Sequence, residues 1–179
     1  MTDRNALWVF AYGSLLWDPG FQPVESVRAR LDGWRRSFCM WSMHFRGTEE
    51  TPGLVLALDA DPEAHCDGLA LRVDPATADE VLSGIRKREL ISDAYEEKTL
   101  SLLLEDKREV QALAYVIRRG HRQYACVDAE TQARTIARAE GQRGPNLDYL
   151  ANTADQLDRL GIGDPELRTL LSRAKALRP

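Results

Sequence analysis

The first pronounced pattern along the chain is an apolar and aromatic run between Trp8 and Trp17. Residues 8–11 are apolar at consecutive positions, which is typical of a buried strand. The run is interrupted at Tyr12-Gly13-Ser14, a small-residue turn, and it stops at Asp18-Pro19-Gly20. A strand that enters such a turn leaves backbone N–H groups that can bind an anion or a developing oxyanion. A buried strand followed by an ordinary turn explains the same residues, so the pattern alone leaves both interpretations open.

Strand-like patterns continue as far as residue 117. The expected strands are one or two within residues 24–41, Leu54–Leu58, Cys66–Val73, Tyr95–Leu104 and Val110–Ile117. Asp32-Gly33 predicts a hairpin turn in the first of these segments, and Asp59-Ala60-Asp61-Pro62 predicts the end of the next strand. Gly68 lies inside a predicted strand, where glycine indicates a bulge or the close approach of another segment.

Helical patterns occur once between the strands and then throughout the C-terminal third. Asp74-Pro75 predicts a helix that runs to Arg88 or Leu90, because Asp can cap a helix and Pro fits its first position. Asp128 and Asp164-Pro165 predict two more starts, and another helix follows a Gly-rich loop at residues 141–146. The last helix is expected to bury Leu167, Leu170, Leu171, Ala174 and Leu177. This order favours an α+β fold with a mixed or closed sheet over a doubly wound parallel sheet.

One position breaks the pattern of the first helix. Its apolar stripe consists of Ala78, Val81, Leu82 and Ile85. Glu89 occupies the next position of that stripe, and such breaks are expected at functional or strained sites. Burial would raise the pKa of this carboxyl and nearby arginines would lower it, so the group could accept and donate protons near neutral pH. An ion pair with Arg86 or Arg88 at the helix end is the alternative interpretation.

Composition narrows the class of protein. The 179 residues are 44% hydrophobic and 29% charged, which is the composition of an ordinary globular domain. The formal net charge is −4, so no overall positive field attracts nucleic acid or anionic membranes. No apolar run approaches the roughly 20 residues that span a bilayer, and residues 1–5 do not resemble the start of a signal peptide. Together with the odd number of cysteines (Cys39, Cys66 and Cys126), this predicts free thiols in a reducing cytoplasm.

Metal and nucleotide chemistry have little support in the sequence. His44, His65 and His121 are far apart, so we expect no metal site and no cofactor. The glycines near Gly13 form no phosphate-binding pattern. A Cys–His pair remains open, although Cys39 and Cys66 have the pattern of buried strand residues. The basic segment 118–122 could meet a phosphate or form a solvated turn.

Four motifs give a more specific indication when they are read together. They are Tyr12-Gly13-Ser14-Leu15, Ser42-Met43-His44-Phe45-Arg46-Gly47, Arg88-Glu89 followed by Tyr95, and Gly144-Pro145-Asn146-Leu147-Asp148-Tyr149-Leu150. In this order and spacing they resemble the ChaC-type glutathione-specific γ-glutamylcyclotransferases, over about residues 8–150. The Tyr-Gly-Ser motif alone marks only the wider superfamily.

The resemblance implies a small mixed β-barrel with flanking helices, in a single domain over residues 1–179. The barrel core would span about residues 8–120 and the C-terminal helices about residues 128–177. It also implies a lyase that converts glutathione into 5-oxoproline and cysteinylglycine, with Glu89 as the catalytic acid/base. The implied substrate-binding residues are Ala11, Tyr12, Gly13, Ser14, Leu15, Leu16, Tyr95 and Tyr149. Arg46 is expected to contact a substrate carboxylate, because its planar guanidinium fits one. For Arg46 a surface ion pair is the alternative, and Tyr95 and Tyr149 fit equally well as core aromatics.

Two departures from the family pattern bear on the substrate. Ala11 stands where family members commonly have Gly, and Asp93-Ala94 stands where they often have Gly-Gly; Asp93 would add a carboxylate near Glu89.

The expected partner is a small molecule, either glutathione or another γ-glutamyl peptide, with no nucleic acid, membrane or obligate protein partner. A cyclotransferase for other γ-glutamyl amines or amino acids, and a non-catalytic γ-glutamyl-binding module, remain the alternatives.

Overall fold

Two unusually long strands, β2 (Glu25–Ser42) and β3 (Gly53–Arg72), dominate the computed structural model, which describes residues 6–178. The sequence predicted interruptions at Asp32-Gly33 and at Asp59–Pro62, and both predictions are wrong, because each strand is continuous. Gly33 adopts a φ of 81°, so the glycine takes a left-handed conformation inside β2 without reversing the chain. Pro62 lies at an exposed position of β3, where a missing N–H donor is tolerated.

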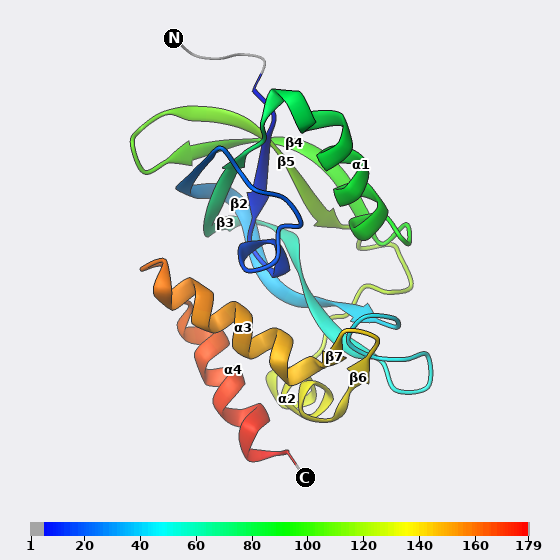
Figure 1. Cartoon of the computed structure of the whole chain (residues 1–179). Helices are drawn as coiled ribbons and strands as arrows, with labels where there is room; N and C mark the ends of the chain where they lie inside the picture. Colours follow the sequence, from blue (N-terminus) through cyan, green and yellow to red (C-terminus); the bar gives the residue numbers. More distant parts are fainter. Residues whose placement is uncertain (1–5, 179) are drawn as a thin grey trace. The chain divides into compact units, whose positions relative to one another are not determined.

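The sheet closes into a barrel in the order β1-β3-β2-β4-β5, with β3 also pairing with β5 (Figure 1). The remaining strands are β1 (Trp8–Ala11), β4 (Tyr95–Leu104) and β5 (Glu109–Ile117). β1 pairs antiparallel with β3 and parallel with β5, so the barrel is mixed. The predicted α+β class with a closed mixed sheet is therefore confirmed, as are the predicted strands that became β1, β4 and β5.

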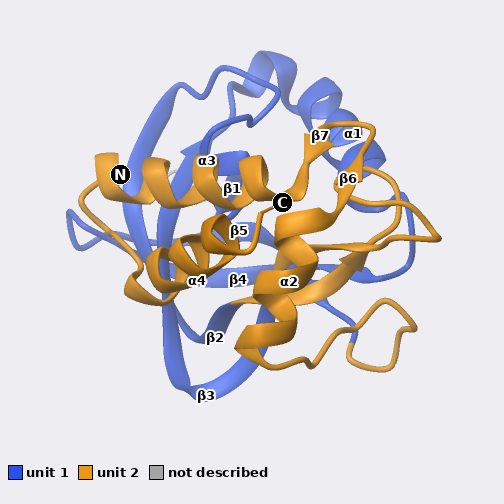
Figure 2. Cartoon of the chain, turned by 90° about the horizontal axis from the view of Figure 1, so that it is seen from below, with its two compact units in different colours: residues 1–36, 58–118 blue, residues 37–57, 119–179 orange. Residues whose placement is uncertain are grey.

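The described chain divides into two compact units, which Figure 2 shows in different colours. Unit 1 comprises residues 1–36 and 58–118, and unit 2 comprises residues 37–57 and 119–179. Two of the boundaries between them fall inside β2 and β3, and the third follows residue 118. The single domain expected over residues 1–179 stays a prediction.

Unit 1 contains β1, β4, β5 and helix α1 (Ala78–Glu89). All residues of β1 are buried, as the apolar run predicted. Gly68 on β3 faces β1 so closely that a Cβ atom would lie 2.3 Å from the carbonyl oxygen of Ala11, which confirms the predicted close approach. A 3₁₀ turn, Pro75–Thr77, precedes α1, and the Asp74 side chain accepts a hydrogen bond from the Ala76 N–H as the predicted cap.

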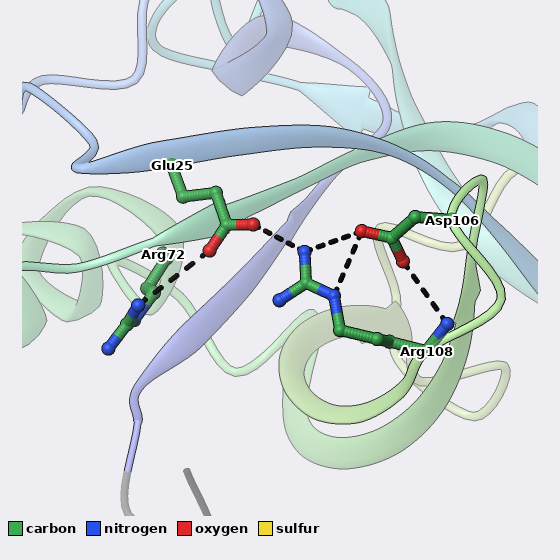
Figure 3. A network of polar contacts seen from close by, with 4 residues as sticks. All are labelled: Glu25, Arg72, Asp106 and Arg108. Carbon is green, nitrogen blue, oxygen red and sulfur yellow. Dashed lines mark hydrogen bonds and ion pairs between the residues drawn. The ribbon is translucent and has the colours of Figure 1, made fainter. Parts of the chain in front are cut away.

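A polar network ties the ends of three strands of unit 1 together on its surface (Figure 3). Arg108 donates hydrogen bonds to Glu25 at the start of β2 and to Asp106 in the β4–β5 turn. Arg72, at the end of β3, lies 3.7 Å from the same glutamate. Asp106 also accepts a hydrogen bond from the Arg108 backbone N–H. These contacts fix the turn against the neighbouring strands.

Unit 2 contains the helices α2 (Ala129–Arg138), α3 (Asn146–Arg159) and α4 (Pro165–Ala176), which pack against one another (Figure 1). Asp128 and Asp164 cap α2 and α4 by accepting backbone N–H bonds, as predicted. The predicted Gly-rich loop contains a short ladder of β6 (Glu140–Gly141) and β7 (Gly144–Pro145). Leu177 was expected in the core of α4 but is 38% exposed, because the helix ends one residue earlier.

Within residues 6–178, no helix is both long enough and apolar enough to cross a membrane.

Candidate active site

The segment after β1 forms a tight helical turn at Ser14–Leu16, where the sequence predicted a small-residue turn. The first bond of this turn runs from the Leu16 N–H to the Gly13 carbonyl at 3.0 Å, and the Asp18 N–H then donates to the Ser14 carbonyl at 2.8 Å. The N–H groups of Ser14 and Leu15 precede that first bond, so the turn itself does not use them. Leu15 and Leu16 are buried, with exposures of only 6% and 5%.

Tyr12 anchors the beginning of this segment. Its hydroxyl donates a hydrogen bond to the backbone carbonyl of Tyr115 at 2.7 Å, and its own carbonyl accepts one from Arg36 Nε at 2.8 Å. Its ring packs near that of Phe10, with centroids 6.1 Å apart. Tyr12 is therefore buried and held by two elements of unit 1, so the turn starts from a fixed backbone position.

Glu89 is the last residue of α1, and its side chain is only 14% exposed. This burial is consistent with the expected position of Glu89 on the inward side of the helix. One carboxylate oxygen lies 3.5 Å from Arg88 Nε, so of the two arginines considered from the sequence, Arg88 is the partner seen in the structure. Arg86 instead donates two hydrogen bonds to the Glu97 carboxylate, one from Nη2 at 2.7 Å and one from Nε at 2.9 Å.

Arg88 connects Glu89 to the turn that follows β1. Its Nη2 donates to the Ser14 hydroxyl at 2.7 Å, and its Nη1 donates to the Asp18 carbonyl at 2.6 Å. The structure therefore brings the end of α1 and the predicted Tyr12–Leu16 segment together within unit 1, through one largely buried guanidinium.

A second polar cluster, which the sequence analysis missed, lies on the neighbouring strands. The buried Tyr115 hydroxyl donates to Glu97 at 2.9 Å. Burial raises the pKa of Tyr115, and the hydrogen bond to Glu97 and the negative charge of Glu89 raise it further. The hydrogen bonds from Arg86 hold the pKa of the Glu97 carboxyl below its ordinary value, against the opposing effect of burial. The negative charge of Glu89 therefore acts electrostatically on the Tyr115 hydroxyl of β5.

A sequence signal for this cluster was present. Glu97 and Tyr115 are direct partners in the antiparallel β4–β5 ladder. Both strands were predicted with nearly correct bounds, and folding them about the charged turn at residues 105–108 brings these two residues opposite each other.

Tyr95 begins β4 opposite Ile117 and is 8% exposed. Its position in the buried part of unit 1 agrees with the core-aromatic interpretation, and its role toward substrate stays a prediction. Of the two departures from the family pattern, Ala11 is fully buried against Gly68, whereas Asp93 is exposed and Ala94 is buried.

Arg46 and Tyr149 lie in unit 2, where they contact each other. The Arg46 guanidinium lies 5.7 Å from the centre of the Tyr149 ring and donates to the Pro145 carbonyl at 3.1 Å. Arg46 is 7% exposed, so the alternative of a surface ion pair is wrong. The Tyr149 hydroxyl accepts a hydrogen bond from the Leu56 N–H at 3.1 Å. Their proposed contacts with substrate stay predictions.

The second motif contacts the loop just before the fourth motif through backbone hydrogen bonds. The Gln142 N–H donates to the His44 carbonyl, and the Arg143 N–H donates to the Phe45 carbonyl, each at 2.9 Å. The Arg143 guanidinium also lies 4.4 Å from the centre of the Phe45 ring. Together with the hydrogen bond from Arg46 to the Pro145 carbonyl, these contacts hold the second motif against the segment that leads into the fourth.

Among residues 6–178, no group of three or more His, Cys, Asp or Glu side chains is arranged to hold a metal ion. All three cysteines are thiols rather than members of disulfides. Cys39 and Cys66 are buried as predicted, whereas Cys126 is exposed.

The fold is that of the γ-glutamylcyclotransferases. A crystal structure of the yeast enzyme described as specific to glutathione has a TM-score of 0.89 at 22% identity, covering 97% of each chain. The family model described as "ChaC-like protein" matches residues 7–177, and the chain belongs to this family. The resemblance inferred from the four motifs is thereby confirmed.

Curated relatives extend the comparison. The Escherichia coli glutathione-specific γ-glutamylcyclotransferase is 35% identical over 98% of this chain and 75% of its own length. The human glutathione-specific γ-glutamylcyclotransferase 1 is 32% identical over 89% of this chain and 73% of its own length.

Proposed function

We propose that this protein is a γ-glutamylcyclotransferase that degrades glutathione, with Glu89 as its general acid/base. The names of its relatives support the substrate and the reaction class. The observation that carries the assignment of Glu89 is its largely buried carboxylate at the end of α1, joined through Arg88 to the turn after β1. A carboxylate in such a position is largely shielded from bulk water and is linked through Arg88 to the family's Tyr-Gly-Ser-Leu motif.

The reaction is an intramolecular aminolysis. The α-amine nitrogen of the γ-glutamyl group attacks the γ-carbonyl carbon and closes a five-membered ring, while the γ-amide C–N bond breaks. The products are 5-oxoproline and cysteinylglycine, and no water molecule is consumed. Because nucleophile and electrophile belong to one molecule, the enzyme contributes mainly by fixing a reactive conformation and by moving protons.

Glu89 supplies the proton transfers in this proposal. Its carboxylate accepts a proton from the substrate α-ammonium, which frees the amine for attack. The protonated carboxyl then donates to the nitrogen of the leaving peptide. The carboxylate accepts the second proton that the ring nitrogen loses and passes it to the released amine, so Glu89 is ionised again at the end of the cycle.

The segment Tyr12–Leu16 holds the γ-glutamyl group, with Ala11 immediately before it. Backbone N–H groups at Gly13–Leu15 stabilise the negative charge that develops on the γ-carbonyl oxygen. Arg46 binds a substrate carboxylate through its planar guanidinium, and Tyr95 and Tyr149 complete the substrate contacts. This chemistry requires no cofactor. We also assign the protein to the cytoplasm, where glutathione keeps thiols such as its three free cysteines reduced.

The deciding experiment measures release of 5-oxoproline and cysteinylglycine from glutathione by the purified protein and by E89Q. We expect E89Q to lower kcat by at least about a hundredfold, the usual contribution of a positioned acid/base. E80Q, which removes an exposed carboxylate from the first turn of the same helix, is the matched control and should retain wild-type activity.

Three results would change the proposal. Full 5-oxoproline release by E89Q would remove Glu89 from its role. Faster turnover of free γ-glutamyl dipeptides than of glutathione would favour the broader cyclotransferase. Binding of glutathione without turnover, with an affinity unchanged in E89Q, would identify a non-catalytic binding module.

A further inference from the structure

We propose that Arg88 is a positioning residue that holds the substrate turn and the Glu89 carboxylate in one fixed arrangement. The inference rests on the proposed role of Glu89. It adds that Arg88 fixes the Glu89 carboxylate relative to the turn after β1. The supporting observations are three contacts made by one side chain, its burial, and the chemistry that only a guanidinium supplies.

Each nitrogen of the Arg88 guanidinium has a different partner. Nη2 donates to the Ser14 hydroxyl, Nη1 donates to the Asp18 carbonyl, and Nε lies 3.5 Å from the Glu89 carboxylate. Ser14 and Arg88 are 74 positions apart in the sequence, so the contact joins two elements that local structure does not connect. The side chain is only 14% exposed, which limits competition from water.

The arrangement exploits a property specific to arginine. Its planar group directs donors to several sides at once and keeps its charge, whereas a lysine ammonium is a single nitrogen on a flexible stem. A lysine at this position would preserve the positive charge but could not make the three contacts at the same time. Arginine and lysine are therefore not interchangeable at position 88.

Neighbouring basic residues do not share this role. Arg86 is directed to Glu97, and its side chain is 48% exposed. Lys87 is exposed on the same helix. The substitution K87Q is therefore a control, because it removes one positive charge next to Arg88 without altering a contact to the turn.

Removal of Arg88 should affect proton transfer as well as geometry. Arg88 Nη1 also lies 3.7 Å from the Asp18 carboxylate. The other charged and titratable groups in this region are Tyr115, which the charge of Glu89 affects, and the Arg86–Glu97 pair that contacts it. Without Arg88, Glu89 loses a positive charge that lies 3.5 Å from its carboxylate. Its ionised form then becomes less favourable, so the acidic limb of the pH profile should move to higher pH.

The test compares R88Q, R88K, K87Q and E89Q with the wild type, using kcat and KM for glutathione, the pH profile of kcat/KM, and the melting temperature. R88Q is expected to lose about a hundredfold in kcat/KM, as a misplaced catalytic group does, and to show the shifted acidic limb. R88K should lose roughly tenfold with the limb unmoved, since it keeps the charge but not the geometry. K87Q should match the wild type.

The proposal is overturned if folded R88Q has wild-type kcat/KM and an unmoved acidic limb. Where R88Q does not fold, R88K decides, because wild-type kinetics in that variant would show that the three-way contact is dispensable. The proposed acid/base role fails separately, by full activity in E89Q, and the proposed substrate fails by inactivity of the wild type on glutathione.

Discussion

The Asn146 side chain pairs with the backbone of Leu54 as a neighbouring β-strand would. Its Oδ1 accepts a hydrogen bond from the Leu54 N–H and its Nδ2 donates to the Leu54 carbonyl, both at 2.8 Å. Two residues farther along β3, the Leu56 N–H donates to the Tyr149 hydroxyl. Side chains of α3 thus form hydrogen bonds with strand groups that another strand would otherwise satisfy, and all four residues are buried.

We predict that N146A destabilises the protein by about 3 kcal/mol. The substitution leaves a buried N–H and a buried carbonyl of Leu54 unsatisfied, and each such group costs about 1–3 kcal/mol. Urea unfolding followed by circular dichroism measures the change in free energy. N152A, at an exposed position of the same helix, is the matched control and should change stability by no more than about 0.5 kcal/mol. Equal unfolding curves for N146A and the wild type would contradict the structural role of this motif.

Local patterns predicted much of the fold but failed where the barrel overrides them. The β4–β5 hairpin was predicted because a charged turn separates two well-formed strands, and its register then follows from the length of that turn. β2 and β3 were each expected to break, because Asp32-Gly33 and Asp59–Pro62 have the residue types of turns. In a closed barrel the strands continue through such positions, since pairing with neighbouring strands outweighs the local preference for a turn.

The candidate site was only partly accessible from the sequence. Glu89 was identified because it interrupts a helical stripe, which is a local signal. The bonds of Arg88 to Ser14 and Asp18 are long-range contacts, and no periodicity or spacing encodes them. The same holds for Arg36, whose contact with the Tyr12 carbonyl joins residues 24 positions apart.

Substitution of the two glycines Gly68 and Gly84 should have opposite effects on stability. In G68A the new Cβ would lie 2.3 Å from the Ala11 carbonyl oxygen and 2.9 Å from the Phe10 ring, so β1 and β3 must separate. We expect a loss of about 3 kcal/mol, typical of severe overpacking. In G84A the Cβ meets nothing within 4 Å and the helix gains about 0.5–1 kcal/mol.

Thermal and urea unfolding of the two glycine variants provide the measurement. The comparison is internally controlled, because both variants add the same methyl group in unit 1. A stability of G68A equal to that of the wild type would show that β1 does not approach β3 as closely as the structure has it. A loss in G84A would contradict the open surroundings of α1 at that position.

Glu97 should make the stability of the protein depend on pH in the acidic range. Hydrogen bonds from Arg86 lower the pKa of its carboxyl in the folded state, whereas the unfolded chain has the ordinary value of about 4.3. A lowered folded-state pKa means that the stabilising contribution is fully present above the unfolded value and is lost as pH falls through the folded value. The wild type should therefore lose stability more steeply below about pH 4.5 than E97Q, which lacks the titrating group.

The measurement is a series of urea unfolding curves between neutral and acidic pH for the wild type, E97Q and E96Q. E96Q removes the same charge from the adjacent position, where the side chain is 39% exposed and pairs with Lys98, and it controls for net charge. At neutral pH, E97Q should be the less stable of the two variants, because Arg86 and the buried Tyr115 hydroxyl lose a charged partner. As pH falls, the difference between E97Q and the wild type should shrink, since protonation removes the same charge from Glu97. A difference that stays constant over the whole pH range would show that the Arg86–Glu97 contact does not perturb this carboxyl in the folded protein.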